Sequence, residues 1–249
     1  MKPILADIGP FHVFSYGLFL SLSFLISSFV IWKYGREELI EEELMDTYVY
    51  TSLVALLFSR VFYILFHFNE FGGNILKYII VRENPGLSII GGLLGGVAFL
   101  FYYTKRRKIN TYKVADIFAL TASLGLSLVS VGEFLGGATF GRETNLPWGV
   151  QVAGVLGKRH PTELYGFILF LILFMVLRFL YKKRFYKKEG YLSLVFLVGY
   201  SLIVFLLEIF KVGSVYLYDR ISLNQVFAIG ILIISSIPFV WKLINKSRK

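Results

Sequence analysis

The strongest constraint on the fold is a series of long apolar runs. Seven runs approach the roughly 20 residues that a helix needs to cross roughly 30 Å of hydrocarbon. They cover residues 11–32, 48–66, 87–103, 114–135, 163–181, 191–210 and 223–243. Runs this long and this uniformly apolar satisfy their backbone hydrogen bonds in lipid only as helices. The sequence therefore predicts an all-α integral membrane protein with seven transmembrane helices.

Composition excludes several classes of protein. Hydrophobic residues make up 56% of the chain, and the mean hydropathy is +0.68, above the range of soluble domains. The net charge of +10 is explained by basic connectors beside anionic lipid, so it does not indicate a nucleic-acid partner. The chain has no cysteine, which excludes disulfides and a thiolate nucleophile of its own. Lys2 precedes the first run and no small-residue cleavage pattern follows it, which predicts a retained helix.

The basic residues predict the orientation of the helices. They gather in the third connector, the fifth connector and the C-terminal tail, as Lys105, Arg106, Arg107, Lys108 and Lys113, then Lys182, Lys183, Arg184, Lys187 and Lys188, then Lys242, Lys246, Arg248 and Lys249. Connectors rich in Lys and Arg stay cytoplasmic. With seven spans, the N-terminus is expected outside and the C-terminus in the cytoplasm. The chain is expected to be a single domain over residues 1–249, with an interfacial helix over 75–81.

Residues 132–149 carry the densest set of unusual residues. An apolar run takes up Glu133, breaks into glycines that include Gly137 and Gly141, and then presents Arg142 and Trp148. One interpretation is a helix end that turns into an interfacial loop and shapes a site. The alternative is a helix terminus with a tight turn and an aromatic anchor. The stretch by itself does not decide between them.

Ionisable residues inside the apolar runs are candidates for function, because charge at membrane depth is costly. They are Arg60, Asp116, Glu133 and Glu208. Arg60 and Tyr63 are three residues apart and share a helix face, as do Glu208 and Lys211. For Glu208 and Lys211, a structural ion pair and a functional role are both open. For Asp116, an ion pair with the basic third connector is favoured.

Two further segments have both a structural and a functional interpretation. Gly91, Gly92, Gly95 and Gly96 form overlapping small-xxx-small pairs, which favour close helix packing or the approach of a lipid chain. Pro161 and Glu163 are ordinary residues at a helix start. Arg159 and His160 stand beside that start, where a helix N-terminus could meet a phosphate. His12, His67 and His160 are too scattered to predict a metal site.

Taken together, these motifs resemble the prolipoprotein diacylglyceryl transferase family over nearly the whole chain. The matching segments are 8–10 with 16–18, 60–66, 86–95, 132–149, 159–165, 199–200 with Glu208, and 222–225. The segment 159–165 is similar to the family's Arg-His-Pro-Ser-Gln-Leu-Tyr, so Glu163 stands at the glutamine. The family has seven membrane spans with the N-terminus outside. The resemblance therefore implies the same fold and the same topology that the charges predict.

The chain departs from the family's pattern at several functional positions. These positions are Ile90 for a histidine, Ser130 for an arginine, Glu133 for an asparagine, Gly136 for a second asparagine, Ala138 for an acidic residue and Val204 for an arginine. The glycines, Arg142 and Trp148 are retained. The resemblance thus implies a conserved scaffold with altered charges in the site.

The resemblance implies a diverged enzyme of lipoprotein biosynthesis in a bacterial plasma membrane. Such an enzyme moves a diacylglyceryl group from phosphatidylglycerol to the cysteine of a prolipoprotein signal peptide and needs no cofactor. The candidate catalytic residues are Glu133, Arg142 and Glu208. The candidate lipid-binding residues are Tyr16, Arg60, Gly91, Gly92, Gly137, Gly141, His160 and Tyr200. A non-catalytic protein that binds phospholipid or lipoprotein on the same scaffold is the alternative. A transporter is disfavoured because no broken helices pair across two halves.

Overall fold

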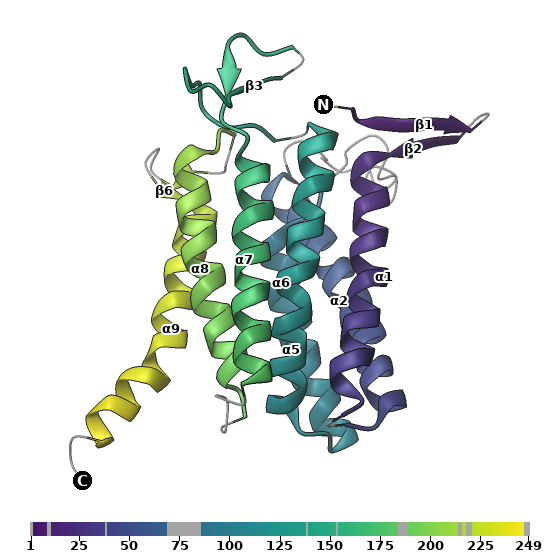
Figure 1. Ribbon diagram of the computed structural model, residues 1–249, viewed down its shortest axis with the longest axis vertical. Coiled ribbons are helices and arrows are strands. Elements are labelled where there is room, and N and C mark those ends of the chain that lie inside the picture. The colour runs from purple at the N-terminus through teal and green to yellow at the C-terminus, as the bar shows by residue number, and fades with distance from the viewer. Residues whose placement is uncertain are drawn as a thin grey trace. The chain divides into compact units, whose positions relative to one another are not determined.

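The computed structural model describes residues 2–8, 11–37, 39–68, 86–137, 139–152, 154–183, 189–213, 216–217 and 221–246. These residues form seven α-helices: α1 (Ser15–Gly35), α2 (Glu41–Phe66), α5 (Ile89–Arg107), α6 (Thr111–Gly136), α7 (Thr162–Lys182), α8 (Tyr191–Phe210) and α9 (Leu223–Lys246) (Figure 1). They also form three two-stranded antiparallel sheets: β1 (Ile4–Ile8) with β2 (Phe11–Phe14), β3 (Val150–Gln151) with β4 (Lys158–Arg159), and β5 (Tyr216–Leu217) with β6 (Ile221–Ser222). The predicted helical membrane fold is thus confirmed, with small hairpins added to it.

Five of the described helices are long and apolar enough to cross a membrane: α1, α2, α6, α7 and α8. The helix α5 spans 19 residues, but its glycines and its basic end, Lys105 to Arg107, lower its mean hydropathy. In α9, the apolar stretch among residues whose side chains are described is Leu223–Ile237. The predicted interfacial helix at 75–81 lies outside the described residues.

The chain divides into two compact units. Unit 1 comprises Met1–Val30 and Asp116–Lys249, and unit 2 comprises Ile31–Ala115. Unit 1 holds most of α1 and α6 together with α7, α8 and α9, whereas unit 2 is built on α2 and α5. The expectation of a single domain stays a prediction.

Small polar residues join the helices of unit 1. The Ser23 hydroxyl on α1 donates to the Gly125 carbonyl of α6 at 3.0 Å, and Ser127 on α6 donates to the Phe167 carbonyl of α7 at 3.0 Å. Hydroxyl side chains that bond across helices are a common way to hold apolar helices together in lipid. The helix α6 therefore lies between α1 and α7, and it is the most buried of the five span-forming helices.

The outward side chains of unit 1 are apolar. Leu25, Ile168, Met175, Leu202 and Ile233 are all more than 45% exposed. A soluble bundle would cover such faces with charged residues. An apolar exterior around hydroxyl-bonded helices is the pattern expected of a protein whose solvent is lipid.

Close packing of glycines joins the two helices of unit 2. A methyl group added at Gly95 would lie 2.4 Å from Cβ of Phe58, and one added at Gly91 would lie 2.5 Å from the Phe58 carbonyl oxygen. Any residue larger than glycine at these positions would force α2 and α5 apart. The predicted role of the glycine motif in helix packing is therefore confirmed for Gly91 and Gly95.

The start of the first apolar run is a strand, which corrects the predicted span 11–32. Residues Phe11–Phe14 pair with Ile4–Ile8, with Asp7 opposite His12. The helix α1 then begins at Ser15, whose backbone N–H donates to the Pro3 carbonyl at 2.9 Å. Apolar and aromatic residues suit a strand and a membrane helix equally, so hydropathy alone could not separate the hairpin from the span.

Candidate functional site

The polar residues of unit 1 concentrate where α6 ends and α7 begins. We call this region the α6–α7 end; it comprises the last turn of α6, residues 137–161, the first turn of α7 and the residues that follow α8. Gly137 ends α6 with a φ of 67°, and its N–H donates to the Glu133 carbonyl at 3.0 Å. A left-handed residue after a helix favours glycine because a Cβ there is strained.

Beyond Gly137, the chain runs between two other segments. The Arg142 N–H donates to the Phe210 carbonyl at 2.7 Å, and the Arg142 carbonyl accepts from the His160 N–H at 3.0 Å. Gly141 forms an isolated antiparallel β-bridge with Lys211. The Gly141 N–H donates to the His160 carbonyl at 3.2 Å. A methyl group at Gly141 would lie 2.5 Å from that carbonyl oxygen, so glycine is needed for the approach. Residues 140–142 are thereby held in fixed register.

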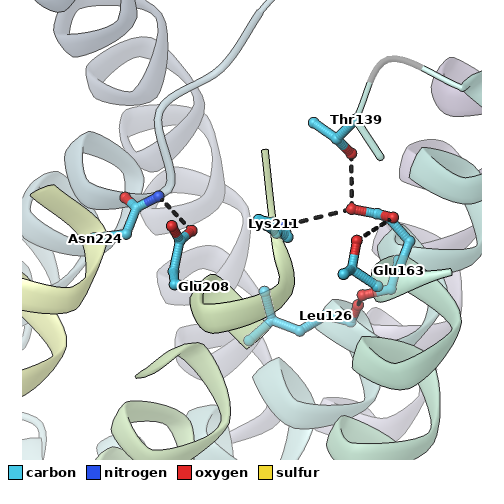
Figure 2. A network of polar contacts seen from close by, with 8 residues as sticks. Leu126, Thr139, Glu163, Glu208, Lys211 and Asn224 are labelled. Carbon is cyan, nitrogen blue, oxygen red and sulfur yellow. Dashed lines mark hydrogen bonds and ion pairs between the residues drawn. The ribbon is translucent and has the colours of Figure 1, made fainter. Parts of the chain in front are cut away.

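Glu163, in the first turn of α7, is the centre of a polar network (Figure 2). One carboxylate oxygen accepts from the Thr139 hydroxyl at 2.8 Å and lies 3.5 Å from the Lys211 ammonium nitrogen. The other oxygen accepts from the Thr162 hydroxyl at 2.7 Å. Glu163 itself is buried, at 2% exposed, although two of its partners, Thr139 and Lys211, are partly accessible to solvent. One side chain thus links the loop, α7 and the segment after α8.

Lys211 lies among three carboxylates. Burial by itself disfavours the charged form of its ammonium group. The carboxylates outweigh burial and raise the pKa of Lys211 above its ordinary value. They belong to Glu133, Glu163 and Glu208. The Lys211 side chain is 24% exposed, so its ammonium group is partly accessible to solvent.

Glu208 also bonds to a residue that the sequence does not predict as its partner. The three-residue spacing pairs it with Lys211, but the ion pair that the structure gives to Lys211 is with Glu163. The buried Glu208 carboxylate accepts from the Asn224 amide of α9 at 2.8 Å (Figure 2). The helix α8 ends at Phe210, so Lys211 is in extended backbone and its side chain no longer follows the helical spacing.

Tyr200 lies deeper on α8. It is 1% exposed and packs against the rings of Phe170 and Phe196, with centroids 6.2 Å and 5.9 Å away. Its hydroxyl has no hydrogen-bond partner among the described residues. Buried hydroxyls are normally paired, so this group is an exception.

His160 and Arg142 lie on the loop itself. The His160 ring is 5.1 Å from Phe210 by centroids, and its Nδ1 is 3.2 Å from the Tyr165 hydroxyl. The same hydroxyl accepts from the Trp148 indole N–H at 2.8 Å. The Arg142 side chain is exposed. The backbone of Arg142 is therefore bonded to two residues of this aromatic cluster, His160 and Phe210, while its side chain is exposed.

Tyr16 joins the α6–α7 end from the first turn of α1. Gly132 and Gly136 of α6 face this turn, and a methyl group at Gly132 would lie 3.4 Å from the Cα of Tyr16. Tyr16 and Glu133 are close enough for their charges to interact. Seven of the predicted site residues of unit 1 therefore gather at one end, as Tyr16, Glu133, Gly137, Gly141, Arg142, His160 and Glu208, whereas Tyr200 lies about two turns further along α8.

The other three predicted site residues belong to unit 2. The Arg60 guanidinium donates to the Gly86 carbonyl at 3.1 Å and lies 5.8 Å from the Tyr63 ring centroid, which confirms their shared helix face. Gly91 is occupied by packing against α2, as described above. A methyl group at Gly92 would be 3.4 Å from Cβ of Ser59, an ordinary contact. Lipid binding by these residues stays a prediction.

Two of the departures from the family's pattern are buried. The Ser130 hydroxyl donates to the Leu126 carbonyl at 2.9 Å, so it is satisfied by its own helix. Ile90 is 6% exposed on α5. Ala138 lies outside the described residues. Ser130 and Ile90 thus carry no charge that could replace the arginine and the histidine of the family.

Asp116 is a helix cap, which corrects the predicted ion pair with the basic connector. Its carboxylate accepts from the backbone N–H groups of Gly190 at 2.8 Å and Ser193 at 2.7 Å. These are unpaired donors at the start of α8, so the acid satisfies them from a neighbouring helix. Asp116 has a structural role remote from the α6–α7 end.

Sequence reasoning missed Glu163, because an acid at a helix start is common. It also missed Thr139 and Asn224, which are uncharged and lie far from Glu163 and Glu208 in the sequence. The available signal was that two carboxylates, Glu133 and Glu163, stand at positions where the family has amides. Within the described ranges, no group of three or more His, Asp or Glu side chains is arranged to hold a metal ion.

The family profile and the relatives that match this chain all point to the same family. The sequence profile described as "Prolipoprotein diacylglyceryl transferase" matches residues 3–241. A relative from Photobacterium profundum is 31% identical over 257 aligned residues, which cover 97% of this chain and 93% of the relative. A relative from Clostridioides difficile is 30% identical and covers 87% of this chain and 86% of its own length. Both relatives are named phosphatidylglycerol–prolipoprotein diacylglyceryl transferase.

Proposed function

Since the chain belongs to the prolipoprotein diacylglyceryl transferase family, we propose that it transfers the diacylglyceryl group of phosphatidylglycerol to the cysteine of a prolipoprotein signal peptide. The observation that carries this proposal is the family match over residues 3–241. Support also comes from the gathering of seven predicted site residues of unit 1 at the α6–α7 end. Neither observation favours the alternative of a protein that binds lipid without catalysis.

The reaction has two chemical requirements. The cysteine thiol loses its proton to a base, and the thiolate attacks the glycerol carbon that bears the phosphate. A carbon–sulfur bond forms while the carbon–oxygen bond breaks, and glycerol phosphate leaves with the electrons of that bond. The site must therefore supply a base for the thiol and positive charge for the departing phosphate.

We assign the base to Glu133. It is at the last turn of α6, half-buried and close to the charge of Lys211. Arg142 is assigned to the phosphate, because its exposed side chain stands on a segment whose backbone is held on both sides. Glu208 is the third proposed catalytic residue, and its bond to Asn224 would fix α8 to α9 beside the reaction.

The proposed lipid-binding residues have three kinds of role. His160 and Tyr16 would contact the headgroup, and Tyr200 would offer its hydroxyl to an ester oxygen. Gly137 and Gly141 would let the loop backbone approach the lipid. From unit 2, Arg60, Gly91 and Gly92 are proposed to contribute to lipid binding, with Gly92 on the less crowded face.

The proposed topology follows the charges of the sequence. Seven spans would place the N-terminus and the α6–α7 end outside, and the C-terminus in the cytoplasm. The protein would be a multi-pass protein of a bacterial plasma membrane. The substrate peptide would then meet the site from the outer face.

Complementation tests the function. Cells depleted of their own transferase are given the wild-type gene, and lipid attachment to a reporter lipoprotein is measured. Rescue is expected, and Arg142→Ala should reduce the attachment rate about 10²-fold, the scale for loss of one stabilising partner of a developing charge. Arg178→Ala, an exposed arginine near the opposite end of α7, is the control and should rescue fully. If the wild type accumulates in the membrane and binds phosphatidylglycerol but never rescues, the non-catalytic alternative is correct.

A further inference from the structure

The turn that joins α5 to α6 gathers positive charge that the proposed reaction does not use. We call it the basic turn; it comprises residues 105–113. Its cations Lys105, Arg106, Arg107 and Lys108 follow one another at the end of α5, and all four side chains are exposed. No ion pair joins them to another residue in the part of the chain that the structure describes. Adjacent cations repel one another, so an anion bound here would relieve that repulsion.

Hydrogen bonds fix the backbone of the basic turn. The Ile109 N–H donates to the Thr104 carbonyl at 2.9 Å, and the Thr104 and Thr111 hydroxyls lie 2.8 Å apart. The Asn110 side-chain oxygen accepts from the Lys113 N–H at 3.3 Å and so caps the start of α6. The four cations therefore project from an ordered bend rather than from a flexible linker.

Two aromatic rings hold the arginines of the turn. Arg106 lies over the Tyr102 ring, 5.7 Å from its centroid, and Arg107 lies over the Tyr103 ring at 5.5 Å. The Tyr103 ring is itself stacked on Phe99, with centroids 5.7 Å apart. A guanidinium that stacks on a ring keeps its N–H donors in its own plane. Neither arginine side chain donates a hydrogen bond to another described residue, so these donors are open to a phosphate, which arginine binds in bidentate fashion.

The basic turn lies at the level of the lipid headgroups. It directly precedes α6, one of the helices long and apolar enough to cross a membrane. Tyr102 and Tyr112, on either side of the turn, are 56% and 58% exposed, and exposed tyrosines are typical of the membrane–water interface. The C-terminal dipole of α5 also favours cations, but it requires neither ring-held guanidinium groups nor open donors. An anionic lipid is thus the partner that both the location and the chemistry fit.

We propose that the basic turn is a binding site for the phosphate of an anionic phospholipid, with Arg106 and Arg107 as bidentate donors and Lys105 and Lys108 as flanking charges. The general attraction of cations to an anionic membrane needs no fixed geometry, whereas this site depends on the bend and the two rings. The turn belongs to unit 2, so the bound lipid is a structural partner and not the substrate of the α6–α7 end. The inference is independent of the transfer reaction and of the membrane face that the turn occupies.

The first test measures lipid binding by the full chain in detergent. Phosphatidylserine, which is anionic but is not the proposed substrate, and phosphatidylcholine are titrated separately, and native mass spectrometry counts the bound lipids. Phosphatidylserine should bind more tightly. Arg106→Gln with Arg107→Gln should weaken its binding about 30-fold, because each cation at an anionic membrane surface contributes about fivefold. Binding of phosphatidylcholine, whose headgroup has no net charge, should stay the same.

A matched control separates a defined site from net charge. Lys2→Gln with Lys158→Gln removes the same amount of charge from exposed positions outside the basic turn and should leave phosphatidylserine binding unchanged. An equal loss in this control, or equal affinity of the wild type for the two lipids, would overturn the proposal. Displacement of phosphatidylserine by inorganic phosphate would show a site for free phosphate and would overturn the assignment to lipid. Lipid-free unfolding midpoints equal to the wild type are expected for both double variants, since all four positions are exposed.

A second pair of variants tests the ring contacts without changing any charge. Tyr102→Leu removes the ring beneath Arg106 but keeps all four cations. Phosphatidylserine affinity should fall about 2–5-fold, the contribution of a cation–π contact. Tyr112→Leu is the control, because this exposed tyrosine contacts no cation among the described residues. Unchanged affinity in Tyr102→Leu, or an equal loss in Tyr112→Leu, would refute a site built on the rings.

Discussion

Two buried carboxylates of unit 1, Asp116 and Glu163, are held in opposite ways. Asp116 accepts from two backbone N–H groups at the start of α8. Glu163 is surrounded by side chains, two threonine hydroxyls and the Lys211 ammonium. Both acids are at most 4% exposed, so burial does not distinguish them.

The partners explain why one acid is structural and the other belongs to the site. Backbone donors at a helix start are fixed by the helix, so Asp116 completes a structure that already exists. Side-chain donors can move, and a lysine brings a charge that acts on its neighbours. An acid bound by the backbone therefore contributes mainly stability, whereas an acid bound by a lysine also holds a cation at the site.

The largest effect is expected for Glu133→Gln at the α6–α7 end. Loss of the proposed base should lower kcat about 10²–10³-fold, within the range measured for general-base removal. The amide is nearly the same size, so the unfolding midpoint should hardly change. Transfer activity and thermal unfolding of the same preparation check both statements. Retained activity would show that Glu133 is not the base. The carboxylates at the α6–α7 end would then have no demonstrated role in catalysis.

An intermediate effect is expected at Asp116. Asp116→Ala leaves two buried N–H donors without a partner, which should destabilise the protein by about 2 kcal/mol. The kcat of the folded fraction should stay at the wild-type value, because the cap lies remote from the site. Asp116→Asn keeps one acceptor and should cost about half as much. A drop in kcat without loss of stability would contradict the structural role.

The smallest effect is expected for Trp148→Phe. This change removes the hydrogen bond from the Trp148 indole to the Tyr165 hydroxyl. The bond lies at the same end of unit 1 as Glu163, but it is exposed. An exposed hydrogen bond contributes about 0.5–1 kcal/mol, so stability and kcat should both stay near wild type. Thermal unfolding and the transfer assay measure the two quantities. A large loss of kcat would show that a residue's position at the α6–α7 end is enough to make it important, even when it is exposed and uncharged.

Hydropathy predicted the helices well because a membrane span needs a long continuous stretch of apolar residues, and such a stretch can be recognised directly in the sequence. The glycine motif was equally readable, since Gly91 and Gly95 repeat at helical spacing and meet α2 on one face. The hairpin over Ile4–Phe14 was not predictable in this way. Its second strand is as apolar as the helix it precedes, and its pairing depends on a neighbour rather than on composition.

The sequence indicated which residues belong to the site, but not which of them contact each other. Glu133, Arg142 and Glu208 stood out as charges in an apolar setting, and the structure brings them to one end of unit 1. The contact of Lys211 with Glu163 joins residues 48 positions apart and depends on where α8 stops. Helical spacing pointed to Glu208 as a neighbour of Lys211, but it could not indicate Glu163, because that contact forms beyond the end of the helix.

The hairpin of β3 and β4 has a practical consequence for locating the site in the membrane. Its base is fixed by the bonds between 140–144 and 158–160, while Leu156 at its tip is 91% exposed. The chain contains no cysteine, so Leu156→Cys would introduce a single thiol at an exposed position of this hairpin. A maleimide that cannot cross lipid would then label intact cells if this hairpin faces outward. The same thiol could carry a fluorophore that reports arrival of a peptide without disturbing Glu163.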